Sequence, residues 1–207
     1  MKRSPMKRFW SHKMRLSAYA TAIAAPIWLV VAAPAPAGAP DAVASTAAVP
    51  TDNVARGKYL VTVAGCNDCH TPWKMGAGGP EPDMSRMLSG HPEQIDLPAP
   101  PQRSDDTWVV SVAATNTAWS GPWGVSFTAN LTPDPETGLG KWTLRDFTST
   151  IRTGRHMGRG RPILPPMPIP MYKHFTDEDL AAIYGYLRTI PAVQNRVPEP
   201  LPPGEGG

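Results

Sequence analysis

The sequence predicts an all-α domain in which a long irregular segment separates the first helix from the second. Three stretches carry apolar residues at helical spacing between capping and stop residues. Residues 65–142, in contrast, are rich in Pro, Gly and Trp. The chain holds 26 Pro and 18 Gly among 207 residues, yet its apolar fraction is an ordinary 41%. We therefore expect one modest core surrounded by long loops.

The first helix is expected over residues 54–64, because Asp52 or Asn53 supplies an N-cap and Gly65 a stop. Within the irregular segment that follows, the pattern allows at most one short strand, at 107–112. Loops of this length inside a compact domain are uncommon and are usually functional.

The second helix is expected over residues 143–153 and ends at Gly154. Its apolar face follows the i, i+3, i+4, i+7 pattern and consists of Leu144, Phe147, Thr148 and Ile151. The third helix begins with a capping pattern formed by Thr176 and Asp179 and ends before Pro191. Its apolar stripe consists of Leu180, Ile183, Tyr184 and Leu187.

The charge of the chain is divided unevenly along its length. The formal net charge is +3, from 20 basic and 17 acidic residues. Six of the basic residues lie in the first fifteen positions, and no acidic residue precedes Asp41. Beyond Ala37 the remaining 14 basic residues face all 17 acidic ones, a balance of −3. The sequence therefore excludes a basic nucleic-acid binder, and no nucleic-acid partner is expected.

The amino-terminal region resembles an export signal. Residues 1–15 are basic and residues 16–33 are uncharged, and a small-x-small cleavage pattern ends at Ala37, so residues 1–37 are expected to be a signal peptide. An uncleaved anchor formed by residues 16–33 is the alternative, although Pro26 disfavours it. Both interpretations predict a periplasmic location, and contact with a membrane only if the leader stays uncleaved.

Composition divides the exported part into three pieces. Residues 38–51 are small and Pro/Ala-rich, which is typical of a flexible spacer. The globular domain is expected over residues 52–196. Residues 197–207 are expected to form a disordered tail because they are rich in Pro and Gly.

The residues Cys66-Asn67-Asp68-Cys69-His70 form the C-x-x-C-H pattern of covalent c-type haem attachment. Two intervening residues allow both sulfurs to reach the vinyl groups of neighbouring pyrroles, and the adjacent histidine can then offer a ring nitrogen to the iron. The pattern predicts one covalent haem c, with its iron, held by Cys66 and Cys69 and ligated by His70.

Two other chemistries use cysteine pairs of this spacing. A zinc site would need further ligands, and the chain has neither a second C-x-x-C nor a Cys/His pair. A thioredoxin-like dithiol is expected after a strand, whereas this motif follows a predicted helix.

A six-coordinate haem needs a second axial ligand. Met167 is the best candidate, because the prolines on both sides of it stiffen the loop, and Met171 is the runner-up. The alternatives for bis-histidine ligation are His91, His156 and His174.

These motifs and their neighbours resemble the bacterial class I cytochromes c (monohaem), in particular the haem domains of cytochrome c subunits of periplasmic alcohol and gluconate dehydrogenases. The matching stretches are Arg56 to Leu60, Cys66 to His70, Asn130 to Asp134, Thr137 to Thr143, Phe147 to Gly154, Leu164 to Pro168 and Thr176 to Leu187. Those subunits commonly carry three haem motifs, and this chain has one.

The resemblance implies a class I cytochrome c fold, with the Pro/Gly-rich segment as an insertion between the haem motif and the distal-ligand region. It implies covalent haem on Cys66 and Cys69, His70 as the proximal ligand and Met167 as the distal one. It also implies that the first and last helices cross closely at Gly57.

The function expected from motif and resemblance is single-electron transfer in the periplasm, by an electron carrier rather than an enzyme. The expected partners are a dehydrogenase, an oxidase or a membrane cytochrome complex. A haem enzyme or gas sensor with an open iron coordination site is the alternative. The expected haem wall consists of Leu131, Trp142, Phe147, Ile163, Leu164 and Leu187, and candidates for binding the propionates are Trp123, Asn130 and Arg155.

Overall fold

The computed structural model describes residues 51–99 and 109–203. The chain divides into two compact units, and all of the described residues belong to the second, Thr46–Gly207. The expected signal peptide and all but the last residue of the expected spacer lie outside the described residues. Within the described part, no helix has the length and apolarity needed to cross a bilayer.

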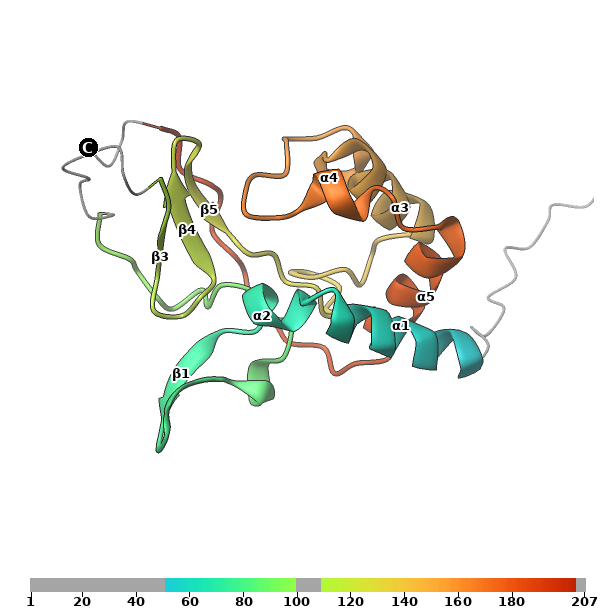
Figure 1. The fold of residues 1–207 in the computed structure, drawn as a ribbon, viewed down its shortest axis with the longest axis horizontal. Coiled ribbons are helices and arrows are strands. Elements are labelled where there is room, and N and C mark those ends of the chain that lie inside the picture. The colour runs from blue at the N-terminus through green and yellow to red at the C-terminus, as the bar shows by residue number, and fades with distance from the viewer. Residues whose placement is uncertain (1–50, 100–108, 204–207) are drawn as a thin grey trace, which may run out of the picture. The chain divides into compact units, whose positions relative to one another are not determined.

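The three predicted helices are present as α1 (Thr51–Val63), α3 (Leu144–Thr153) and α5 (Asp177–Leu187). Helices α1 and α5 pack closely against each other (Figure 1). At the crossing, a Cβ atom on Gly57 would lie 2.0 Å from the carbonyl oxygen of Ala182 and 2.8 Å from Cβ of Tyr186. Only glycine allows so close an approach of two helix backbones, so the expected crossing at Gly57 is present.

Local side-chain chemistry explains where α3 and α5 begin. Thr143 and Asp146 form a reciprocal capping box at the start of α3. The hydroxyl of Thr176 accepts a hydrogen bond from the backbone N–H of Asp179 at the start of α5. Helix α3 ends at Gly154, whose φ of 64° is the left-handed conformation that glycine tolerates.

The core lies among these helices. Its buried members are Leu60, Val61, Leu88, Leu139, Phe147, Ile151, Leu180, Ala182, Ile183, Leu187 and Ile190. Eight of these eleven residues lie on α1, α3 and α5, and Leu88, Leu139 and Ile190 are added by loops. Helix amphipathicity therefore explains how α1, α3 and α5 pack together, and we call this part the helical half of the domain.

The all-α prediction is not confirmed, because the described part of the predicted irregular segment forms two small antiparallel sheets. After α2 (Cys66–His70), β1 (Trp73–Gly76) pairs with β2 (Gly79–Pro82) as a hairpin. The second sheet, at the opposite end from α5 in Figure 1, contains β3 (Ser111–Val112), β4 (Ala118–Gly121) and β5 (Gly124–Phe127) in that order. The expected strand at 107–112 survives only as β3, since 107 and 108 lie outside the described residues.

Three short helical turns complete the fold: η1 (Met84–Arg86), η2 (His156–Gly158) and α4 (Ile169–Tyr172). Sequence periodicity does not reveal elements of this length, because they contain too few residues for a face to repeat.

The prediction of a disordered tail over residues 197–207 is wrong at Leu201, which pairs with β5. Leu201 forms an antiparallel bridge with Val125, in which each N–H donates to the other's carbonyl at 2.9 Å. The bridge extends the second sheet beyond β5. Gly124 makes room for it, since a Cβ there would lie 2.0 Å from the carbonyl oxygen of Leu201. Pro/Gly-rich composition describes local propensity and does not detect pairing with a distant strand.

Candidate functional site

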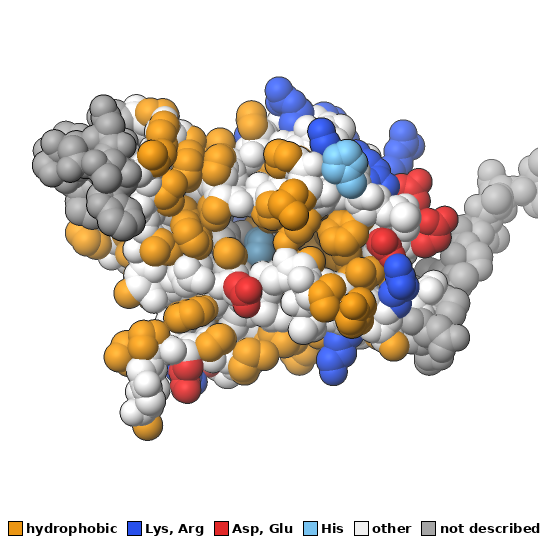
Figure 2. Space-filling model, viewed as in Figure 1, with side chains coloured by type: hydrophobic (Ala, Val, Ile, Leu, Met, Phe, Trp, Pro, Cys, Tyr) orange, Lys and Arg blue, Asp and Glu red, His pale blue; other side chains and the backbone are white. Residues whose placement is uncertain are grey.

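A cavity of about 490 Å³ lies beside α2. That volume is within the range usual for small-molecule and cofactor sites. Figure 2 shows this face: hydrophobic side chains surround a hollow in which a histidine is visible. The lining comes from α2, the segment after β5, α3, the loop that leads to α4, α5 and the carboxyl-terminal segment. The cavity therefore joins regions far apart in the sequence.

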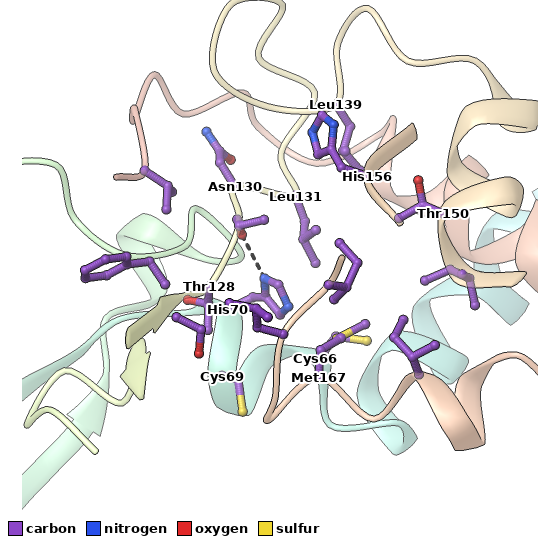
Figure 3. A pocket seen from close by; sticks show the side chains of 18 of the residues that line it. Cys66, Cys69, His70, Thr128, Asn130, Leu131, Leu139, Thr150, His156 and Met167 are labelled. Atoms are coloured by element: carbon purple, nitrogen blue, oxygen red, sulfur yellow. Dashed lines mark hydrogen bonds between the residues drawn. The ribbon is translucent and has the colours of Figure 1, made fainter. Parts of the chain in front are cut away.

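All four predicted haem-binding residues line this cavity: Cys66, Cys69, His70 and Met167 (Figure 3). The structure brings together a motif and a methionine that are separated by almost one hundred positions. Met171, the runner-up ligand, is 71% exposed and is not among the lining residues.

The three alternative histidine ligands differ in position. His91 is fully buried outside the cavity, where its Nδ1 pairs with the Thr117 hydroxyl at 2.9 Å. His174 is exposed and does not line the cavity. His156 does line it, and its ring packs edge-on against Trp142 with centroids 5.0 Å apart. Of the three, only His156 has access to a bound group.

His70 is held in one orientation. It is buried, and its Nδ1 lies 2.7 Å from the carbonyl oxygen of Ala129. A carbonyl can only accept, so Nδ1 carries the hydrogen and Nε2 keeps its lone pair. In Figure 3 this second nitrogen faces the side of the cavity where Cys66 and Met167 lie. Burial lowers the pKa of His70, which favours the neutral imidazole that ligates a metal.

The two thiols differ from redox-active cysteines. Burial raises the pKa of Cys66 to about 11 and also raises the pKa of Cys69. Nucleophilic thiols show the opposite shift, because the thiolate is the reactive form. The site therefore does not favour a thioredoxin-like dithiol. The described residues also contain no group of three or more His, Cys, Asp or Glu side chains arranged to hold a metal ion, as zinc would need.

The loop that bears Met167 is fixed at both ends. Before it, the carbonyl of Pro165 accepts a 2.5 Å hydrogen bond from the hydroxyl of Ser126 in β5. After it, the carbonyl of Met167 itself accepts from the N–H of Ile169, at the start of α4, at 2.9 Å. The Met167 side chain is half-buried and packs against the core.

The rest of the cavity wall suits a large planar apolar group. All six apolar residues expected in the wall line the cavity: Leu131, Trp142, Phe147, Ile163, Leu164 and Leu187. This apolar lining, the pair of sulfurs and the oriented imidazole together fit a haem attached at the C-x-x-C-H motif.

The predicted propionate partners do not point into the cavity. Trp123 donates to Ser126 at 3.3 Å and Arg155 to the Gly160 carbonyl at 2.9 Å, and neither lines the cavity. Asn130 lines it, but its amide points away from His70 (Figure 3) and donates to the carbonyl of Val193. The cations that do line the cavity are Arg161 and Arg196.

Sequence reasoning missed Arg196, the last residue of the expected globular domain, because it belongs to no recognisable motif and the tail expected directly after it was predicted to be disordered. Arg161 forms an ion pair with Glu199 at 3.1 Å, and both residues line the cavity. Glu199 belongs to the carboxyl-terminal segment that also contains Arg196. The available signal was the alternation of charged residues and prolines in residues 196–200.

No family model matches the chain. It is 27% identical over 150 residues to the cytochrome c subunit of the quinone alcohol dehydrogenase of Gluconobacter oxydans, with 70% of this chain and 24% of that protein covered. It is 28% identical over 133 residues to the gluconate 2-dehydrogenase cytochrome c subunit of Pantoea cypripedii, with 64% and 22% covered. A diheme cytochrome c of Cereibacter sphaeroides is 34% identical over 77 residues, with 37% and 25% covered.

The chain thus spans about a quarter of the length of these relatives. Their names are those of cytochromes, not of catalytic subunits, which agrees with the prediction of an electron carrier rather than an enzyme. The resemblance predicted from the C-x-x-C-H motif and its neighbours is confirmed: the chain is similar to the cytochrome c subunits of alcohol and gluconate dehydrogenases.

Proposed function

We propose that this domain binds one haem c covalently through Cys66 and Cys69, ligates its iron with His70 and Met167, and carries single electrons in the periplasm. The observation that carries the proposal is that these four residues line one apolar cavity. The haem, when bound, supplies the iron that gains and loses an electron.

The protein's own residues prepare the site for that chemistry. The hydrogen bond from His70 to Ala129 keeps Nε2 available for the iron. A methionine ligand and burial of the ring by apolar side chains both favour the reduced state and raise the reduction potential. Arg196, and Arg161 beside its partner Glu199, are the arginines lining the cavity that would offset the negative charge of the propionates of a bound haem.

The partners we propose are a dehydrogenase or respiratory donor and an oxidase or membrane cytochrome complex as acceptor. The names of the relatives support a dehydrogenase, because two of them are cytochrome subunits of such enzymes. The basic and then uncharged amino-terminal segment supports export to the periplasm.

Acid-acetone extraction of the purified protein tests haem attachment. We expect the haem to stay with the polypeptide, and the intact mass to exceed that of the apoprotein by one haem. Haem that is extracted into the acetone phase would contradict covalent binding.

A second measurement, addition of carbon monoxide to the native reduced protein, tests the alternative of an open iron site. We expect an unchanged spectrum, and rapid carbon monoxide binding would favour the haem enzyme or gas sensor.

A further inference from the structure

The carbonyl of Ala129, which receives the hydrogen bond from His70, belongs to an extensive buried polar network. Three segments meet there: residues 88–91, residues 128–132 and residues 193–195. We call them together the polar clamp. Four of its hydrogen-bonded side chains are completely or almost completely buried, namely His91, Asn130, Thr132 and Asn195. Buried polar groups of this kind are costly unless they are hydrogen-bonded, so their pairing defines the local structure tightly.

Residues 88–91 connect the histidine to its acceptor segment. The N–H of Gly90 donates to the carbonyl of His70 at 2.8 Å, and the N–H of His91 donates to the carbonyl of Thr128 at 2.9 Å. Gly90 has a φ of 78°, and a Cβ there would lie 2.4 Å from the Thr128 oxygen. This segment therefore fixes the backbone of His70 relative to residues 128–132, the segment after β5 that carries Ala129.

The side chain of Asn130 anchors the segment that carries Ala129 from the other side. Its Nδ2 donates to the carbonyl of Val193 at 2.8 Å and lies 3.3 Å from that of Asn195. Its Oδ1 accepts from the N–H and the hydroxyl of Thr132 at 3.0 and 2.8 Å. Because Asn130 follows Ala129 directly, these bonds limit rotation of the peptide unit whose oxygen faces His70.

Asn195 closes the network. Its Nδ2 donates to the carbonyls of Ser89 and His91 at 2.7 and 2.8 Å, and its Oδ1 accepts from Arg86 at 2.9 Å and from the N–H of Glu93 at 3.0 Å. One amide thus ties the carboxyl-terminal segment to residues 86–93, and Asn130 ties the same segment to residues 128–132.

We propose that Asn130 and Asn195 are positioning residues that hold the Ala129 carbonyl on Nδ1 of His70 and so set the reduction potential of the haem. The inference rests on the proposed function, since it needs His70 on the iron. A fixed acceptor on Nδ1 increases the electron donation of the imidazole, which stabilises ferric iron and lowers the potential. The polar clamp opposes the effect of methionine ligation and apolar burial, and the two together define the working potential.

Redox titration of the haem-loaded Asn130→Ala variant tests the proposal. We expect the ratio of reduced to oxidised haem at a fixed ambient potential to rise about threefold relative to the unmodified protein. NMR of the reduced protein gives an independent readout, because a loosened acceptor lets the Nδ1 proton of His70 exchange about tenfold faster. Val61→Ala is the matched control: Val61 is buried in α1 away from the cavity, so it lowers stability without touching the clamp.

Each outcome decides the question. A shift of potential and exchange in Asn130→Ala that Val61→Ala does not reproduce supports the positioning role. An unchanged potential and exchange rate in a variant that keeps its haem and both ligands overturns it. If Asn130→Ala yields no haem-loaded protein, Thr132→Val replaces it, because it removes one hydroxyl of the same network, and a smaller shift in the same direction is expected. Failure of the proposed function looks different: the unmodified protein would retain no covalent haem.

Discussion

The helical half of the domain and the polar clamp hold the two sides of the same cavity by different means. Helices α1, α3 and α5 meet through apolar side chains, whose burial stabilises the fold in proportion to area and without strict geometry. The clamp joins its three segments through amides, hydroxyls and backbone groups at 2.7–3.3 Å. Apolar packing therefore builds the cavity, and directional hydrogen bonds orient the His70 imidazole within it.

The largest effect is expected at the cavity that both regions line, at the two cysteines of the haem motif. The double substitution Cys66→Ala and Cys69→Ala removes both thioether positions, so covalent haem should be lost completely. Haem staining after denaturing electrophoresis measures this directly. Asn67→Ala keeps the C-x-x-C-H spacing and is the matched control, which should stain as strongly as the unmodified protein. Persistent staining of the double variant would contradict the assignment.

The next effect breaks the helical half. Gly57→Ala places a Cβ 2.0 Å from the Ala182 oxygen and forces α1 and α5 apart. We expect a loss of about 3 kcal/mol in the free energy of unfolding, measured by denaturant titration. Gly78→Ala, at the tip of the β1–β2 hairpin with open space around its Cβ, should change stability by less than about 0.5 kcal/mol. Equal stabilities of the two variants would show that the crossing is not tight.

The polar clamp should respond less strongly in stability than in ligand orientation. Asn195→Ala leaves the carbonyls of Ser89 and His91 without their side-chain donor, which should cost about 2 kcal/mol. Asn53→Ala, an exposed position on α1, is the control and should cost under about 0.5 kcal/mol. Amide hydrogen exchange should show the loss concentrated in residues 86–93. Uniform faster exchange over α1 and α5 as well would argue that the two regions are one cooperative unit.

The smallest effect on stability is expected at the start of α3, at the edge of the helical half. Thr143→Ala removes the hydroxyl that caps α3 and should cost about 1 kcal/mol, measured by thermal unfolding. The same hydroxyl, followed by the backbone N–H of Thr143, lowers the pKa of Asp146 below its usual 3.8. A depressed carboxyl pKa stabilises the fold above pH 3.8, and this contribution is lost as the pH falls through the folded-state value.

The unmodified protein should therefore lose more stability between pH 5 and pH 2 than Thr143→Ala does, because the variant has already lost the larger cause of the shift and keeps the backbone N–H. Parallel pH profiles for the two proteins would contradict the role of the capping box. Thr143→Ser, which retains a hydroxyl, should restore the steeper profile.

The same contrast explains what the sequence predicted. The three helices follow from residues such as Phe147 and Leu180, because apolar periodicity and caps are local signals. The C-x-x-C-H motif and the prolines beside Met167 are local signals too, and the residues that they pointed to do line one cavity. The hydrogen-bond partners of Asn130 and Asn195 were not predictable, because they lie far away in the sequence. From the sequence alone, an asparagine that will be buried cannot be told from one in a surface loop.

The sheets escaped prediction for a related reason. Strands such as β3 contain two residues and carry no alternation, and the pairing of Leu201 with Val125 depends on a glycine that admits the returning chain. Arg196 reaches the cavity only because this carboxyl-terminal segment folds back. The parts of the site that the sequence did not predict therefore depend on pairing between residues far apart in the chain.

The proton NMR spectrum of the reduced protein tests the central claim, His70 and Met167 as axial ligands, most directly. A methionine methyl held over a haem is shifted strongly upfield by the ring current. We expect one such methyl signal in the unmodified protein, its loss in Met167→Leu, and its retention in Met171→Leu, since Met171 is exposed and outside the cavity. A spectrum without this signal, or one in which Met167→Leu leaves it in place, would contradict the assignment of Met167.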